Sequence, residues 1–406
     1  MLNQIKAAWQ NFPRQYWLLV GGSLLSATGG AMIWPFLTIY LRQRLDLPMT
    51  TVASLLTINA ATSLISSFIA GMAADRFGRK HVMSLSLLCG ALYYGLLGSA
   101  STFLEFALLM GFWGAASALY PVGANAMVAD LVADQDRVDA YSFLRMVHNV
   151  GVAVGPIAGG ILIAASYNVA FAAAGAFFGL YALINIFFIR ETLTRVEKSA
   201  SAPKDSLGGY GRILQDRIFV WFVLAFTFTM VTATLMFVML PVYANENFNV
   251  PESQYGYIVT VNALMCIFVQ YFVTQLIKKR PPLPVLAVGA LFYALGAGSV
   301  AFGTSFWAFV VSMVILTIGE LIMTPTATSL TAQLAPEDMR GRYMSVYSLT
   351  WPLAAGFGPI FAGLLNDNIA PVAMWYGGLA VGLLGVGVFL ILSRRFKITL
   401  THNPLP

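Results

Sequence analysis

Long apolar runs separated by short polar stretches dominate the chain. Each run is about 20 residues or longer, the length that a helix needs to cross roughly 30 Å of hydrocarbon. The pattern therefore predicts an all-α membrane protein rather than a soluble domain. We place twelve spans, at residues 16–41, 50–73, 82–100, 103–129, 140–164, 168–189, 218–243, 254–277, 283–303, 306–331, 343–366 and 372–393.

The twelve expected spans divide into two sets of six around a polar segment. Residues 190–217 contain Ser, Gly, Pro and mixed charge, so we expect a helix bundle at 1–189, a cytoplasmic linker at 190–217 and a second bundle at 218–406. Both halves also carry matching residues at one offset of 203 positions, which indicates a duplicated pair of six-helix bundles. The matches are Arg14 with Arg217, Tyr40 with Tyr243, Arg137 with Arg340, and Gly155-Pro156 with Gly358-Pro359.

Composition and charge agree with a membrane location. Hydrophobic residues make up 58% of the chain and charged residues 10%, and the net charge is +6. This positive charge does not indicate nucleic-acid binding, because it follows the excess of Lys and Arg in cytoplasmic loops. Of 23 Lys and Arg, only Arg42 and Arg44 fall in loops expected outside, and only Arg145 falls inside a span. Both termini are therefore expected to be cytoplasmic.

The loop at residues 71–80, between the second and third spans, has an unusual density of charge. It reads Gly-Met-Ala-Ala-Asp-Arg-Phe-Gly-Arg-Lys, and four of its ten residues are charged. Gly78 allows the tight backbone that so short a loop needs. The loop resembles the signature of the major facilitator superfamily, G-x-x-x-D-R-x-G-R-K/R. The matching residues are Gly71, Asp75, Arg76, Gly78, Arg79 and Lys80.

This resemblance implies a transporter of two pseudo-symmetric six-helix bundles in a bacterial cytoplasmic (inner) membrane. It implies that Asp130, at the end of the fourth span, pairs with Arg79 of the signature loop. It also implies that Asp75 caps the eleventh span, where the N-terminal helix dipole favours an anion. The turn at residues 190–193, Arg-Glu-Thr-Leu, resembles a short Glu-Thr turn common in the superfamily.

A glycine motif in the fifth span resembles the G-x-x-x-G-P-x-x-G-G motif of drug/proton antiporters in this superfamily. Glycine at every fourth position leaves a bare stripe that lets another helix approach closely. Packing without any bearing on transport is the alternative reading. The motif residues are Gly151, Gly155, Pro156, Gly159 and Gly160.

One motif of those antiporters is incomplete here. Their fourth span carries Arg-x-x-Gln-Gly, whose Arg is implicated in proton coupling. This chain has Met110 and Trp113 where that motif has Arg and Gln, and keeps Gly114. Coupling would therefore need other groups.

Ionisable residues deep inside spans are costly and usually functional. Glu320 in the tenth span is the leading candidate for binding a proton or the substrate, and Arg145 and His148 in the fifth span come next. We expect Glu320 and Arg145 to pair in one state of the transport cycle and to separate in the other. Asn125 and Trp34 are further candidates, because resemblance places the first and fourth spans on the cavity wall.

The sequence predicts a secondary transporter that moves a small hydrophobic or amphiphilic solute, most simply by proton-coupled efflux. The expected partners are the small molecule, protons and the lipid bilayer, with no nucleic acid, and the protein is expected to be a monomer. No P-loop and no hydrolase or zinc-protease motif is present, so we expect neither an enzyme nor a cofactor or metal. The alternatives are a proton-coupled importer or facilitator of a small metabolite such as a sugar, and a membrane scaffold or sensor.

Overall fold

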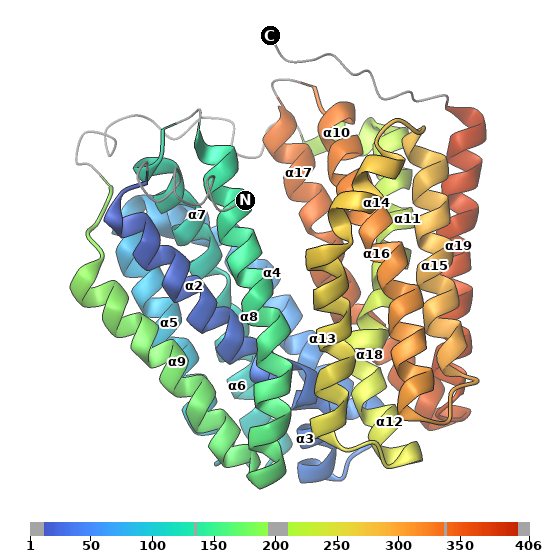
Figure 1. Cartoon of the computed structure of the whole chain (residues 1–406), viewed down its shortest axis with the longest axis horizontal. Coiled ribbons are helices and arrows are strands. Elements are labelled where there is room, and N and C mark those ends of the chain that lie inside the picture. The colour runs from blue at the N-terminus through green and yellow to red at the C-terminus, as the bar shows by residue number, and fades with distance from the viewer. Residues whose placement is uncertain (1–11, 134–135, 194–209, 337–338, 397–406) are drawn as a thin grey trace. The chain divides into compact units, whose positions relative to one another are not determined.

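The structure is a computed structural model that describes residues 12–133, 136–193, 210–336 and 339–396. Every regular element in these ranges is a helix and none is a strand, which confirms the all-α prediction (Figure 1). In the first half of the chain the elements are α2 (Arg14–Ile33), the 3-10 turn η1 (Trp34–Phe36), α3 (Leu37–Leu45), α4 (Met49–Phe77), α5 (Arg79–Leu97), α6 (Phe103–Ser117), α7 (Leu119–Leu131), α8 (Arg137–Ala165) and α9 (Tyr167–Phe188).

The second half of the chain follows the same plan with more interruptions. Its elements are α10 (Tyr210–Gln215), α11 (Arg217–Thr234), the π-helical turn η4 (Leu235–Met239), α12 (Leu240–Phe248), α13 (Glu252–Phe268), α14 (Gln270–Ile277), α15 (Pro282–Val300), α16 (Phe306–Leu334), α17 (Arg340–Ser348), α18 (Thr350–Asn368) and α19 (Ala373–Arg395).

Hydropathy of these helices supports the expected membrane spans. Among the described residues, ten helical runs are long and apolar enough to cross a membrane, and the pair α13 and α14 makes an eleventh if it is one span bent by 54°. The remaining expected span, at 82–100, overlaps α5. Each of the twelve predicted spans therefore overlaps a helix.

Local chemistry explains where several helices begin and bend. Pro35 lies in the 3-10 turn that interrupts the first span, as expected of a residue without a backbone N–H. Thr102 and Glu105 form a reciprocal capping box at the start of α6, and the side chains of Ser166 and Asp216 accept backbone hydrogen bonds at the starts of α9 and α11. These caps satisfy amide donors that a helix leaves unpaired.

The chain divides into two compact units. Among the described residues, those in 12–37 and 58–193 belong to the first unit, and those in 38–57 and 210–396 belong to the second. The second unit thus includes a segment of the first half of the chain, the outer end of the first span and the start of α4. The central part of the expected linker at 190–217 and the expected cytoplasmic termini fall on residues 194–209, 1–11 and 397–406, which lie outside the described residues.

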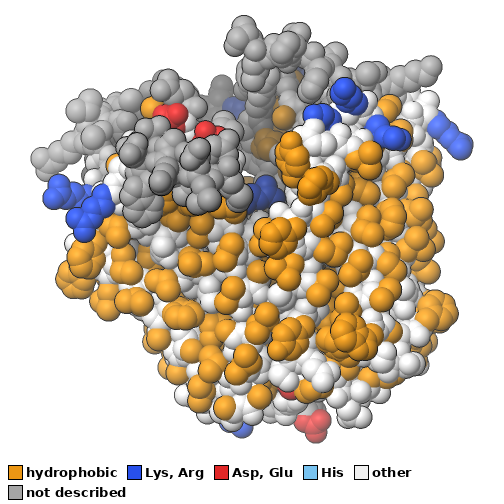
Figure 2. Space-filling view, viewed as in Figure 1, with side chains coloured by type: hydrophobic (Ala, Val, Ile, Leu, Met, Phe, Trp, Pro, Cys, Tyr) orange, Lys and Arg blue, Asp and Glu red, His pale blue; other side chains and the backbone are white. Residues whose placement is uncertain are grey.

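Each unit has its own packed interior. In the first unit, Tyr16 of α2 is fully buried, and its hydroxyl donates to the carbonyl of Ala140 on α8 over 2.8 Å. In the second unit, α15 lies against both α16 and α19, and Gly296 faces the backbone of Leu316 so closely that a Cβ would collide with it. Large apolar side chains that remain exposed, such as Phe187 and Phe272, lie on helix faces. Figure 2 shows apolar side chains over much of the described surface in view, with most of the visible Lys and Arg side chains in the upper part. This distribution is the one that a lipid-facing surface requires.

Candidate functional site

The segment at 71–80, which was expected to be a loop, is almost entirely helical: residues 71–77 end α4, residues 79–80 begin α5, and only Gly78 lies between the two helices. Gly78 adopts a φ of 103°, a backbone conformation that side-chain-bearing residues rarely adopt. A Cβ at Gly78 would also collide with the carboxylate of Glu191. Glycine is therefore required at this position for two independent reasons.

Arg79 links the signature loop to the end of α7. Its side chain forms ion pairs with Asp75, from Nη2 to Oδ1 over 3.3 Å, and with Asp130, from Nε to Oδ2 over 3.3 Å. The expected contact between Asp130 and Arg79 is therefore present. Nε and Nη1 of Arg79 are buried and make no well-aligned hydrogen bond, so charge attraction rather than directional bonding holds this group. Asp130 also accepts a hydrogen bond from the hydroxyl of Thr192 over 2.6 Å.

Glu191 caps the N-terminus of α5 from a distant part of the chain. Its carboxylate accepts hydrogen bonds from the backbone N–H of Arg79 over 3.0 Å and of Lys80 over 3.1 Å. It lies 3.2 Å from Nδ1 of His81. A carboxylate at a helix N-terminus satisfies orphan amide donors and interacts favourably with the helix dipole. The Glu-Thr turn is thus part of the signature-loop site.

The pKa of the Glu191 carboxyl reflects these contacts. Burial alone raises this pKa, but hydrogen bonds from Leu193, Arg79 and His81 outweigh burial and lower the pKa below its ordinary value. The carboxylate is consequently charged at neutral pH, as the cap requires.

Three further residues of the signature loop have simpler surroundings. Lys80 donates from Nζ to the carbonyl of Ile186 over 2.7 Å, which ties α5 to α9. The guanidinium of Arg76 lies 5.6 Å from the ring centroid of Phe77. Nothing in the structure explains Gly71, where an added Cβ would meet no atom within 4 Å.

The glycine stripe of the fifth span packs α8 onto α2 within the first unit. A Cβ on Gly151 would lie 2.8 Å from Cβ of Ala27, and one on Gly155 would lie 2.8 Å from the carbonyl oxygen of Thr28. Gly159 faces the backbone of Met32, and its Cβ would collide there. Pro156 and Gly160 are buried beside the stripe. The stripe therefore brings two helix backbones together, and its bearing on transport direction stays a prediction.

Glu320 is the middle residue of the 29-residue helix α16. At 1.5 Å per residue it lies about 21 Å from either end. Its carboxylate Oε2 accepts a hydrogen bond from Nδ2 of Asn262 on α13 over 2.8 Å. The same amide nitrogen donates to Oγ1 of Thr317 over 3.0 Å. Because Asn262 and Thr317 are buried, this polar cluster lies inside the helix packing of the second unit.

The other candidate residues lie in the first unit. All four side chains are exposed in the first unit: those of Arg145, His148, Asn125 and Trp34. The carbonyl of Asn125 accepts a hydrogen bond from the hydroxyl of Tyr141 over 2.7 Å. Arg145 and Glu320 belong to different units, so their expected pairing stays a prediction, as does the expected cap of the eleventh span by Asp75.

Met110 and Trp113, which replace the Arg and Gln of the antiporter motif, lie in an aromatic cluster of the first unit. Met110 is fully buried, and its sulfur lies 3.7 Å from the hydroxyl of Tyr93. Trp113 stacks on the ring of Tyr93 at a centroid distance of 5.5 Å. These surroundings favour packing at Met110, because a buried cation there would need a counter-ion.

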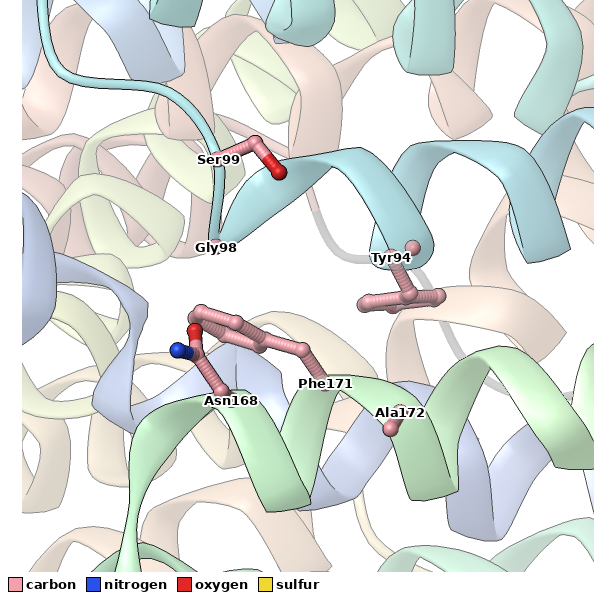
Figure 3. A pocket seen from close by; sticks show the side chains of 7 residues that line it. Tyr94, Gly98, Ser99, Asn168, Phe171 and Ala172 are labelled. Carbon is pink, nitrogen blue, oxygen red and sulfur yellow. The ribbon is translucent and has the colours of Figure 1, made fainter.

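A small pocket opens between the end of α5 and the start of α9 (Figure 3). It has a volume of about 180 Å³ and is lined by residues that include Tyr94, Gly98, Asn168 and Phe171. Asn168 and Phe171 reach from α9 towards the end of α5 that carries Gly98 and Ser99. Drug-sized ligands occupy pockets of about 300–1,000 Å³, and none of the candidate residues lines this one.

Sequence reasoning missed several residues of these sites. The predicted candidates were ionisable groups inside spans, together with Asn125 and Trp34 on the expected cavity wall, and they did not include Asn262, Thr317 or Gln270. An amide within the apolar span at 254–277 was nevertheless a usable signal, because buried amides need hydrogen-bonding partners. The capping role of Glu191 gave no local signal, because its partners lie more than 100 residues away.

Comparison with known proteins agrees with this architecture. The sequence matches the family model described as Major Facilitator Superfamily over residues 19–284 and 232–403. It is 26% identical to a Na(+), Li(+), K(+)/H(+) antiporter of Planococcus maritimus, with 94% of each chain covered. It is 24% identical to the multidrug resistance protein MdtH of Escherichia coli O1:K1 / APEC, again with 94% of each chain covered.

Solved structures share the fold. The nucleoside transporter NupG, crystallised as a point mutant, superposes with a TM-score of 0.82 at 12% identity, covering 93% of this chain and 100% of NupG. A POT family transporter in complex with a thioalcohol-conjugated peptide superposes with a TM-score of 0.77 at 18% identity, covering 94% and 96% of the two chains. At these identities the likeness concerns the fold alone.

Proposed function

The chain belongs to the Major Facilitator Superfamily of membrane transporters, and on that premise we propose that it exports a small amphiphilic solute in exchange for protons. It works by alternating access in a bacterial cytoplasmic membrane. Glu320 is the group that takes up and releases the proton. Arg145 of the other unit approaches Glu320 in one state and leaves it in the other.

The observation that carries this proposal is the place of Glu320. A carboxyl at the centre of a span is expensive to keep in hydrocarbon and usually has a function. The Asn262 amide, which donates one hydrogen bond to Oε2 of Glu320, is neutral and does not compensate the negative charge of the carboxylate. A proton, a cationic solute or the Arg145 guanidinium can each neutralise the carboxylate. Coupling follows if only one of them does so at a time.

Two features support an amphiphilic solute. Trp34 is 38% exposed in the interrupted part of the first span, and large aromatic surfaces suit apolar ligands. MdtH, which is similar over almost the whole chain, is named a multidrug resistance protein.

A second candidate function is exchange of a monovalent metal cation for protons. The specific observation in its favour is the similarity to the Planococcus antiporter, whose name gives Na(+), Li(+) and K(+) as its ions. The same carboxyl of Glu320 would then exchange protons with the metal ion instead of an organic cation.

The experiment is proton movement in proteoliposomes that contain the purified protein and a trapped pH-sensitive dye. Ethidium tests the first candidate and NaCl the second, each added to one side at neutral pH. We expect one of these two solutes to drive proton efflux or influx in the wild type. The rate of this proton movement should be at least tenfold lower in Glu320→Gln. Glu252→Gln, at the start of α13, is the matched control and should keep the wild-type rate.

The direction of transport needs a separate measurement. Accumulation of ethidium in inside-out vesicles supports export, whereas uptake of a sugar or other metabolite by right-side-out cells would favour the importer. A protein that moves neither ethidium, sodium nor metabolites at normal expression would favour a scaffold or sensor.

A further inference from the structure

Helices α13 and α14, which together are long and apolar enough to make one broken span, meet at a bend beside α16, the helix that carries Glu320. α13 ends at Phe268, α14 begins at Gln270, and their axes differ by 54°. Broken helices in transporters place backbone irregularity next to binding and coupling groups. Each of the two pieces, α13 and α14, is bound to α16 by a side-chain hydrogen bond.

The first piece, α13, is bound to α16 by the hydrogen bond from Asn262 to Glu320, and the strength of this bond depends on the charge of Glu320. The one proton of the Thr317 hydroxyl is donated to the carbonyl of Met313 over 2.7 Å. Thr317 can thus only accept from Asn262, as can an ionised Glu320 carboxylate. Asn262 supplies both hydrogens from one nitrogen, so the orientation of its amide follows from the chemistry of its neighbours. A protonated Glu320 would lose the charge that strengthens this bond.

The second piece, α14, is bound to α16 by a hydrogen bond from Gln270 to the carbonyl of Leu321. This carbonyl has no donor within α16, because the residue four positions later is Pro325. Pro325 lies inside α16 and has no N–H to donate to the carbonyl of Leu321, four residues earlier. Nε2 of Gln270 donates to that carbonyl over 2.9 Å. Leu321 directly follows Glu320, so both pieces of the broken span are anchored at consecutive residues of α16.

We propose that Asn262 and Gln270 are positioning residues that couple the occupancy of Glu320 to the bend between α13 and α14. When Glu320 is ionised, Asn262 holds α13 against α16. When a proton neutralises Glu320, that bond weakens while the bond from Gln270 to Leu321 persists, because it depends on Pro325 and not on charge. α13 then moves relative to a fixed α14, and the angle at the break changes. This inference rests on the proposed role of Glu320 for its link to transport, but the anchors can be tested without transport.

The bend can be measured by electron paramagnetic resonance on the purified full-length chain. Spin labels on Tyr257→Cys in α13 and Leu276→Cys in α14, both exposed positions, span the break. The two native cysteines are removed with Cys89→Ala and Cys266→Ala. Glu320→Gln should shift the distance distribution, and the same substitution in an Asn262→Leu background should leave it unchanged. Identical distributions with and without Glu320→Gln would overturn the proposal.

A thermal double-mutant cycle tests the Gln270 anchor independently. Gln270→Leu should lower the apparent melting temperature by a few degrees, because it leaves a buried carbonyl without a donor. Pro325→Ala returns a backbone N–H to α16, so Gln270→Leu in that background should cost less than half as much. Equal costs in the two backgrounds would overturn the proposal for Gln270.

Transport then separates this inference from the proposed function. Asn262→Leu should change the number of protons moved per ethidium or Na⁺ at least twofold, whereas a residue that only stabilises the fold would lower the rate at a constant ratio. An unchanged ratio in Asn262→Leu would refute coupling through Asn262 even if Glu320→Gln abolishes proton movement. Loss of coupling in Asn262→Leu together with normal coupling in Glu320→Gln would refute the assignment of Glu320 instead.

Discussion

The carboxylate of Asp367, near the end of α18, accepts two hydrogen bonds from Thr50 at the start of α4. Oδ2 accepts from the backbone N–H of Thr50 over 2.8 Å and from its hydroxyl over 2.7 Å, and Oδ1 accepts from the N–H of Met49 over 3.1 Å. Gly363 lies one turn away, and a Cβ there would approach Cα of Thr50 to 2.7 Å. A residue of the second half of the chain thus caps a helix of the first half inside one compact unit.

Removing this cap should destabilise the protein. Asp367→Ala leaves the amides of Met49 and Thr50 without acceptors, at a cost of about 1–3 kcal/mol. The measurement is the apparent melting temperature in detergent. Asn368→Ala is the matched control, because Asn368 is exposed and donates only to the carbonyl of Leu364 in its own helix. Equal melting of the two variants would show that the cap contributes nothing.

The cap made by Glu191 should have a distinct pH dependence. Its pKa is lowered in the folded protein, so it contributes stability above the unfolded pKa and loses this contribution as pH falls through the folded value. Glu191→Gln should therefore lower the free energy of unfolding by about 1–2 kcal/mol at pH 7. The difference should shrink below about pH 4. Melting curves of wild type and variant that stay equally far apart down to pH 3 would contradict this account.

The two acids around Arg79 should differ in their effects. The side chain of Asp75 is 74% exposed and that of Asp130 is 25% exposed, and exposed ion pairs contribute little stability. Asp75→Asn should melt within about 0.5 kcal/mol of wild type but transport more slowly. Asp130→Asn, unlike Asp75→Asn, should lower the free energy of unfolding, because the Asp130 carboxylate faces the buried guanidinium of Arg79. Unchanged turnover in Asp75→Asn liposomes would remove Asp75 from the transport cycle.

A side chain on the glycine stripe of α8 should destabilise the protein, and Gly71, outside the stripe, provides the control. Gly155→Leu should cost at least about 1–3 kcal/mol, because even its first side-chain atom would lie 2.6 Å from Cβ of Ala31. Gly71→Leu should cost much less, because that position has open space. Expression and melting of both variants measure the difference. A normally stable Gly155→Leu with wild-type transport would show that α8 and α2 do not need this close approach.

Local patterns in the sequence were sufficient to predict where the twelve spans lie, but not the breaks that divide some of them into two helices, such as α6 and α7 or α17 and α18. A run of about 20 apolar residues has few alternatives to a membrane helix. The tight backbone predicted at Gly78 is present, although the charged residues around it continue the two helices instead of forming a loop. The signature-loop resemblance also led to the pair of Arg79 and Asp130, which the structure contains.

The missed features depend on contacts between distant parts of the chain. The break after Phe268 and the donation from Gln270 to Leu321 arise where α14 meets α16, and no periodicity in either helix indicates them. Glu191 and Asp367 are similar cases, because a carboxylate becomes a helix cap only when tertiary packing delivers it to the helix end. The grouping of residues 38–57 with the second half likewise follows from packing and not from the repeat.

The most direct test of the central claim is proton release when solute binds to the purified protein in weakly buffered detergent solution. Ethidium and NaCl are added separately at several starting pH values, and a dye reports the protons released. The account predicts release in the wild type and in Glu252→Gln, and its loss in Glu320→Gln. Wild-type release from Glu320→Gln would contradict the claim that Glu320 exchanges its proton for the transported solute.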